Sequence, residues 1–188
     1  MAPGGVIGRT PSGMCGERVT VCDAGDVKFA FEQRWTASVD DVVEVYLDEG
    51  FWTGLSDLTT TSPPKVLGVE RSADAATVRL HWVLSVDLPK EAARFIDPDD
   101  VAWTEETTWD LAARSATVSF RPDQAAGLLR ASATAVLHQD GADAVRTVRG
   151  ELKVRIPLVG HKVEPVIVDG IGEHLDEEAH AVATRLAG

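Results

Sequence analysis

The segment VAWTEETTWDL, residues 101–111, carries the side chains with the clearest chemical potential. Its residues alternate as a β-strand requires, which puts one set of side chains on a single face: Trp103, Glu105, Thr107 and Trp109. The tryptophans indicate that this face points inward. A carboxylate among aromatic side chains loses hydration, so its pKa rises and it can serve as an acid, a base or a ligand anchor. Glu105 is therefore the candidate functional residue.

Structural alternatives exist for this glutamate. A bulge would turn Glu105 outward and Glu106 inward, or a nearby arginine would satisfy the carboxylate. Gln33 poses the same question in an earlier strand, between Phe31 and Trp35. There we expect an amide that is hydrogen-bonded within the core.

Histidines offer a second possible chemistry, in the segment HLDEEAH. His174 and His180 are six residues apart, so on a helix they diverge by about 120°, and we predict no metal site and no cofactor. His174 and Glu178 are four residues apart and predict a surface ion pair, or alternatively a polar rim where the helix meets a cavity. Common motifs of hydrolases, nucleotide-binding loops and zinc peptidases do not occur in the sequence.

The elements that would position these residues begin with a strand, VKFAFEQRWTA. Ser38 with Asp41 three residues later predicts the start of a helix, and FWTGLSDL predicts a short second helix. Pro63 and Pro64 separate this pair from six alternating segments, each typical of a half-buried strand. Short successive connections favour an antiparallel sheet of seven strands in total.

The C-terminal segment predicts a long amphipathic helix, whose apolar residues fall on one arc: Val168, Ile171, Leu175, Ala179, Val182 and Leu186. Pro165 is tolerated only in a first turn, so we expect the helix to start near residues 162–164. No strand follows, and the apolar arc must therefore cover the sheet. The prediction is an α+β fold, with a curved antiparallel sheet wrapped around a terminal helix.

Composition excludes several classes of partner. The formal net charge of −12 argues against nucleic acid and anionic membranes. No apolar run is long enough for stable membrane insertion, and no secretory signal is evident, so a cytoplasmic location is the default expectation. Residues 1–25, which include Cys15 and Cys22, are predicted to be a disordered extension, and residues 26–188 a single domain.

The order of elements and several segments resemble a known superfamily. FAFEQRW, ASVDDVVEVYLDEGFW, WTEETTWDL and above all GELKVRIPLVGHKVEP are similar to an actinobacterial family of unknown function within the START-like, or SRPBCC, helix-grip superfamily. His161 and Pro165 depart from the family pattern. The resemblance implies a cavity between the sheet and the long helix, of the kind in which superfamily members bind lipids and other apolar molecules. It assigns no catalytic residue.

The small inward positions Ala131, Ala133 and Ala135 fit such a cavity, unless tryptophans fill the space instead. The predicted function is binding or carriage of a hydrophobic small molecule or lipid without catalysis. The predicted walls are Phe31, Trp35, Tyr46, Trp82, Trp103, Glu105, Thr107, Trp109, Ala133, Ile171 and Leu175. Alternatives are a polyketide cyclase or dehydratase that uses Glu105 as general acid or base, and a protein-interaction module with a closed pocket.

Overall fold

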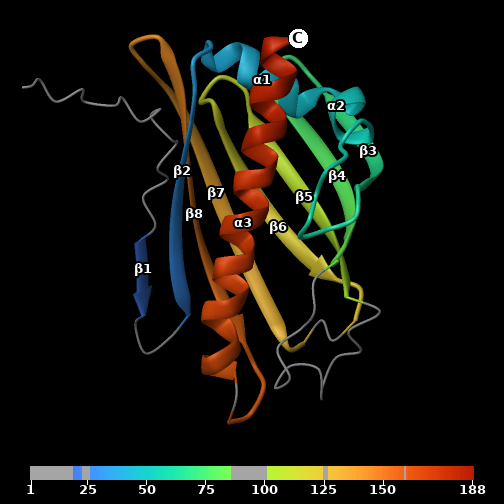
Figure 1. Ribbon diagram of the computed structural model, residues 1–188, viewed down its shortest axis with the longest axis vertical. Coiled ribbons are helices and arrows are strands. Elements are labelled where there is room, and N and C mark those ends of the chain that lie inside the picture. The colour runs from blue at the N-terminus through green and yellow to red at the C-terminus, as the bar shows by residue number, and fades with distance from the viewer. Residues whose placement is uncertain (1–18, 23–25, 86–100, 125–126, 159) are drawn as a thin grey trace, which may run out of the picture.

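The computed structural model of this protein describes residues 19–22, 26–85, 101–124, 127–158 and 160–188. Its elements, in chain order, are β1 (Val19–Cys22), β2 (Val27–Trp35), α1 (Val39–Leu47), α2 (Glu49–Thr53), β3 (Lys65–Arg71), β4 (Ala75–Val83), β5 (Ala102–Asp110), β6 (Ser115–Pro122), β7 (Leu129–Asp140), β8 (Asp143–Val154) and α3 (Gly160–Ala187). The strands form one antiparallel sheet in the order β1-β2-β8-β7-β6-β5-β4-β3. The long helix α3 lies across one face of this sheet, and α1 and α2 lie near the C-terminal end of α3 (Figure 1). This is the predicted α+β architecture.

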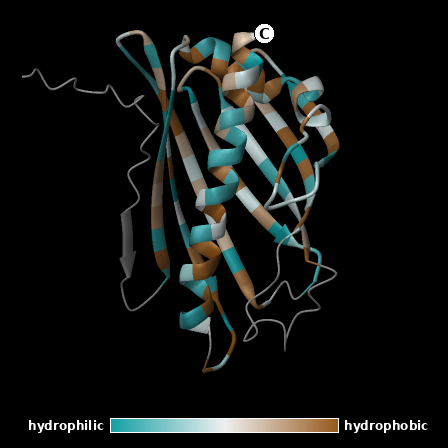
Figure 2. Ribbon diagram, in the orientation of Figure 1, coloured by the Kyte–Doolittle hydropathy of each residue, from teal (hydrophilic) through white to brown (hydrophobic). Residues whose placement is uncertain are grey.

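Strict alternation of side chains explains why the sheet has one buried face. Along β2 and β4, every second side chain is buried, and along β7 the alternation is equally regular over its central part. Hydrophobic and hydrophilic bands accordingly alternate along the strands (Figure 2). The buried set points toward α3 and forms the core, so we call this the inner face.

The two short helices begin where the sequence supplies caps. The Ser38 hydroxyl accepts a hydrogen bond of 3.1 Å from the backbone N–H of Asp41, as the capping pattern predicts. The Asp48 carboxylate accepts one of 2.8 Å from the N–H of Gly50 and starts α2. Tyr46 and Trp52 then point into the core from these helices.

The helix α3 is held on the inner face by packing and by side chains of β2. The residues of α3 that are almost fully buried include Val168, Ala179 and Val182. Gln33 donates a 2.6 Å hydrogen bond to the carbonyl of Leu175, and the indole N–H of Trp35 donates one of 2.9 Å to the carbonyl of Ala179. These bonds fix the helix along its axis, which hydrophobic contact alone leaves free to slide. The expectation that Gln33 is a hydrogen-bonded core amide is confirmed.

The turn from β8 into α3 depends on a close backbone approach. A Cβ atom at Gly160 would lie 2.3 Å from the carbonyl oxygen of Val154, so only glycine fits there. The buried carboxylate of Glu164 accepts a 2.9 Å hydrogen bond from the N–H of Val154 and ties the helix start to the end of the sheet.

The structure differs from the prediction at the start of the long helix and at the N-terminal edge of the sheet. The helix starts at Gly160 rather than near residues 162–164, which leaves Pro165 inside it. Pro165 and His161 are exposed, so water can bond the carbonyl that the missing N–H leaves free. The sheet also has an eighth strand: Val19–Cys22, within the segment predicted to be disordered, pairs with β2. Residues 1–18 and 23–25 of the predicted disordered extension lie outside the described residues.

Candidate functional site

Aromatic rings fill the interior at the end of the sheet next to α1 and α2. Tyr46 lies at the centre, with ring centroids 6.4 Å from Trp35 and 5.8 Å from Trp109. Trp52 adds an edge contact to Trp82 at 6.2 Å. All of these rings are buried. This end of the interior is thus a packed core. Several residues that were predicted to line a cavity, such as Trp35 and Tyr46, are part of this core.

Directly beside these rings lies a buried ion pair. Arg146 of β8 contacts the carboxylate of Glu178 of α3 and the hydroxyl of Tyr46 through Nη1. The Tyr46 hydroxyl donates a 2.8 Å hydrogen bond to Glu178 Oε1, and the guanidinium carbon lies 4.5 Å from the tyrosine ring centroid. Burial raises the pKa of Tyr46 well above its usual value, so the phenol stays protonated. Burial alone would lower the pKa of Arg146, but its charge attraction and hydrogen bond to Glu178 and the charge of Glu105 help to raise it overall.

Glu105 lies on the inner face of β5, as the alternation predicts. Its register partners are Leu80 of β4 and Phe120 of β6. Thr107 donates a 3.1 Å hydrogen bond to Glu105 Oε1. The neighbouring Glu106 points outward and accepts a 2.8 Å hydrogen bond from Arg79, so no bulge exchanges the two glutamates.

Two effects raise the pKa of Glu105 to about 7. Desolvation by the surrounding protein is the larger, and the negative charge of Glu178 is the second. The hydrogen bond from Thr107 and the positive charge of Arg146 oppose them only in part. At neutral pH the carboxyl group therefore exists in both its protonated and ionised forms.

Exposure along β5 shows where the interior opens. Trp109 is buried, but the inner-face residues Trp103, Glu105 and Thr107 are only half-buried. The same holds for the inner-face residues of the adjoining strands and of α3 at that end: Phe120, Leu129, Ala131 and Ile171. These side chains lie on the inner face but are incompletely covered, so we call this partly exposed region, which borders the aromatic core, the recess. In Figure 1 the N-terminal half of α3 lies in front of β7 and β8, whereas β5 and β4 lie to the side of the helix.

His174 faces the interior rather than the surface. Its ring makes an edge contact with Trp82 at a centroid distance of 4.7 Å, and Nδ1 lies 3.4 Å from the hydroxyl of Thr60. Burial lowers the pKa of His174, so the ring is neutral at pH 7. The predicted surface ion pair with Glu178 was wrong, because Glu178 is buried against Arg146.

The adjacent Glu177 ties the loop before β3 to α3. Its carboxylate accepts hydrogen bonds from the backbone N–H groups of Thr59 and Thr60 at 2.9 and 3.3 Å, and from both threonine hydroxyls. These bonds lower the pKa of Glu177, although burial alone would raise it. Glu177 thus holds the loop before β3 against α3.

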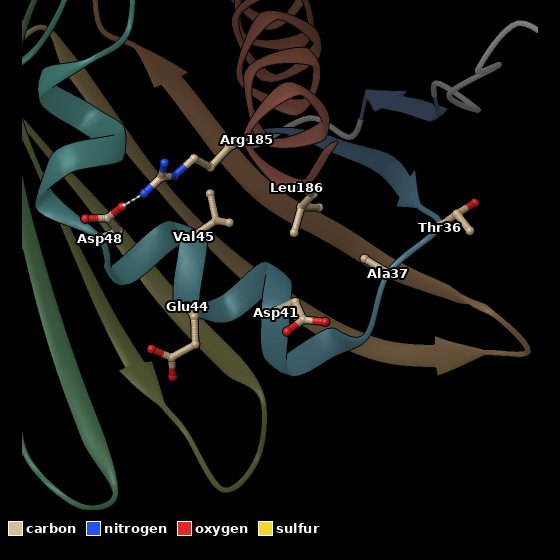
Figure 3. A pocket seen from close by; sticks show the side chains of 8 residues that line it. All are labelled: Thr36, Ala37, Asp41, Glu44, Val45, Asp48, Arg185 and Leu186. Carbon is tan, nitrogen blue, oxygen red and sulfur yellow. Dashed lines mark hydrogen bonds and ion pairs between the residues drawn. The ribbon is translucent and has the colours of Figure 1, made fainter. Parts of the chain in front are cut away.

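Other hollows lie away from this recess. One, of about 590 Å³, lies between α1 and the C-terminal turn of α3, and its lining residues are Thr36, Ala37, Asp41, Glu44, Val45, Asp48, Arg185 and Leu186 (Figure 3). Its carboxylates already have partners, such as Arg185 at 2.7 Å from Asp48. A second, of about 440 Å³, is lined mainly by outward-facing residues of β2, β6, β7 and β8 around Gly150. Within the described ranges, no three His, Cys, Asp or Glu residues are grouped as a metal site requires.

The family of the chain follows from a sequence comparison. A model of the DUF2505 family, described as a protein of unknown function, matches residues 30–186. The chain belongs to this family. A comparison of the DUF2505 protein with curated proteins found no match.

Solved structures with the same fold extend the comparison. The ZhuI aromatase/cyclase of a Streptomyces species has a TM-score of 0.55 and 16% identity over 86% of this chain and 93% of its own. Norcoclaurine synthase from Thalictrum flavum, in complex with dopamine and hydroxybenzaldehyde, has a TM-score of 0.58 and 20% identity over 90% and 88%. A START superfamily protein from Mycobacterium smegmatis has a TM-score of 0.50 and 13% identity over 86% and 97%. The DUF2505 protein therefore has the START-like helix-grip fold that the sequence predicts.

The structure divides the predicted site residues of the DUF2505 protein into two groups. The buried core holds Phe31, Trp35, Tyr46, Trp82, Trp109, Ala133 and Leu175. The half-buried recess holds Trp103, Glu105, Thr107 and Ile171. His180 is exposed, whereas His174 contacts Trp82. Their role in binding stays a prediction.

Sequence reasoning missed the ion pair between Arg146 and Glu178. A signal was present in both elements. Arg146 occupies an inward position between Ala144 and Val148 of β8, and Glu178 is three residues after Leu175 on the apolar arc of α3. A charge that interrupts each of two apolar faces predicts a buried partner for both. None of the helices in the described part of the chain has the length and apolar character of a membrane span.

Proposed function

We propose that this protein binds an apolar small molecule in the recess between the inner face of the sheet and α3. The observation that carries the proposal is Glu105: a carboxyl group that faces inward, is only half-buried and lies among aromatic and aliphatic side chains. A half-accessible polar group in apolar surroundings is what a binding site uses to orient a ligand. The aromatic core would close the site at one end.

The inner-face surroundings of Glu105 supply the apolar walls. Trp103 and Phe120 flank it on β5 and β6, and Ile171 of α3 is partly buried against the same core. Ala131 on β7 contributes little volume, which favours space for a ligand over further packing. Binding of dopamine and hydroxybenzaldehyde by norcoclaurine synthase supports the proposal, because that protein has the same fold.

Filling the recess tests the proposal. Ala131→Trp places a large ring on the inner face, whereas Ser132→Trp places the same ring on the exposed outer face one residue away. We expect Nile red, a neutral apolar dye, to bind the unchanged protein and Ser132→Trp and to lose at least tenfold in affinity for Ala131→Trp. Binding that Ser132→Trp removes and Ala131→Trp retains would place the dye in the outer hollow and contradict the proposal. Native mass spectrometry of the purified protein would identify any retained ligand.

Acid–base catalysis is the second candidate, and the pKa of Glu105 near 7 favours it. A carboxyl group that is half ionised at neutral pH can both donate and accept a proton. Cyclisation of a linear polyketide is the reaction class that we would assay, given the fold shared with an aromatase/cyclase. Glu105→Gln should abolish such turnover, and turnover that survives this substitution would exclude the mechanism.

A further inference from the structure

We infer that the ligand of this recess carries a basic amine, which binds as an ammonium ion against Glu105, and that ligands ending in a carboxylate are excluded. This inference rests on the proposed binding function and adds the chemical class of the ligand. The inference follows from the charges of the described residues in and around the recess, which we consider for each strand and helix.

The positive charge of Arg146 is already neutralised by Glu178. Arg146 is the buried cation of the inner face, and it is paired with Glu178 while also contacting the Tyr46 hydroxyl. This pair has no net charge. The strands on either side of β5 each carry an arginine on the outer face. Arg79 of β4 is paired with Glu70 and Glu106, and the exposed Arg121 of β6 lies opposite Thr104.

Within the part of the chain that the structure describes, the other titratable groups of the interior add no cation. From α3, His174 is neutral because burial lowers its pKa, and Glu177 is held at the edge by Thr59 and Thr60. From α1, Tyr46 remains a neutral phenol. The register neighbours of Glu105, Leu80 on β4 and Phe120 on β6, are apolar.

Among the described residues, an ionised Glu105 therefore has no cation that compensates its negative charge. None of the ion pairs among the described residues involves Glu105. An ammonium ion would neutralise this charge, and the rings of Trp103 and Phe120 offer faces that attract cations. A carboxylate would instead bring a second negative charge beside the first, which low-dielectric surroundings penalise strongly.

The inference has a definite pH signature. Protons compete with the ammonium ion for the Glu105 carboxylate, whose pKa lies at about 7. If only the ionised form binds the amine, the affinity at pH 6 is about tenfold weaker than at pH 8. An alkylamine stays protonated throughout this range. A carboxylate ligand should show the opposite trend, because it requires Glu105 to be protonated.

Three probes with one apolar body test the inference: naphthylmethylamine, naphthylmethanol and naphthoic acid. Calorimetric titration of the full chain at pH 6 and pH 8 measures each affinity. We expect the amine to bind tightest at pH 8 and to weaken about tenfold at pH 6, with the alcohol unchanged. Glu105→Gln should abolish both the preference for the amine and its pH dependence, while Glu106→Gln, one residue away on the outer face, should change neither.

The possible failures are distinguishable. If Nile red and all three probes fail to bind, the proposed binding function itself is wrong. If Nile red or the alcohol binds but the amine is no tighter at pH 8, the function stands and the amine inference is overturned. Should Glu105→Gln not fold, the ratio of affinities at the two pH values in the unchanged protein decides the question alone.

Discussion

Arg146 on β8 and Glu178 on α3 form an ion pair inside the protein, with both side chains 7% exposed. The pair joins the middle of the sheet to the helix that covers it, and Tyr46 from α1 joins the pair through its hydroxyl. The charges of the pair also act on the carboxyl group of Glu105. One contact thus connects the stability of the fold with the chemistry of the candidate site.

Glu178→Gln should destabilise the protein by about 3 kcal/mol, because it leaves the Arg146 guanidinium buried without an anion. Chemical unfolding measures this change in free energy. Asp176→Asn, an exposed substitution on the same helix, is the control and should have little effect. An equally small effect of Glu178→Gln would show that the ion pair is not maintained in solution.

The same substitution should lower the pKa of Glu105 below 7. It removes the negative charge that raises this pKa and frees Arg146 to attract the carboxylate. Titration of the Glu105 side-chain carbon by NMR measures the shift. A pKa that stays at about 7 would show that desolvation alone sets it.

The stability of the protein should depend on pH through Glu105. Its folded-state pKa of about 7 lies above the unfolded value near 4.5, so the folded state binds the proton more tightly. This contribution is present in full below about pH 4.5 and is lost as the pH rises to 7. Between pH 5 and pH 8 we expect a loss of about 2 kcal/mol that Glu105→Gln removes, after allowance for partial solvent access. The difference between the unfolding free energies of the two proteins measures it, and Glu106→Gln should behave like the unchanged protein.

Two glycines of α3 should respond oppositely to alanine. Gly160→Ala forces a Cβ against the Val154 carbonyl and should cost about 2 kcal/mol. Gly170→Ala meets no atom within 4 Å and should stabilise the helix by about 0.5–1 kcal/mol, because alanine favours the helical backbone. Thermal unfolding of both variants tests the two predictions. Equal effects would contradict the close approach at Gly160.

Strand alternation explains why the inward position of Glu105 could be predicted. Each residue of β5 must point to the side opposite its neighbour, so the tryptophans at positions 103 and 109 determine where Glu105 points. The position of His174 could not be predicted in the same way. A residue at the border of a helix arc turns inward or outward according to its neighbours, and here Trp82 and Thr60 accommodate the ring.

The helix α3 likewise has features that the sequence predicts and contacts that it does not. Its apolar arc predicts which side it buries, yet the side-chain hydrogen bonds from Gln33 and Trp35 join residues more than a hundred positions apart. The arc also conceals Glu178, which is tolerated only because β8 brings Arg146 opposite it. Such pairings depend on the register between elements, and periodicity within one element says nothing of that register.

The sequence by itself determined the order of the elements, the inner face of each strand and the inward direction of Glu105, because these depend on local periodicity. Only the tertiary structure decided that aromatic rings fill one end of the interior, that Arg146 is neutralised by Glu178, and that no ion pair among the described residues involves Glu105. The physical reason is that burial and charge balance are properties of neighbours in space. Those neighbours come from strands and helices far apart along the chain.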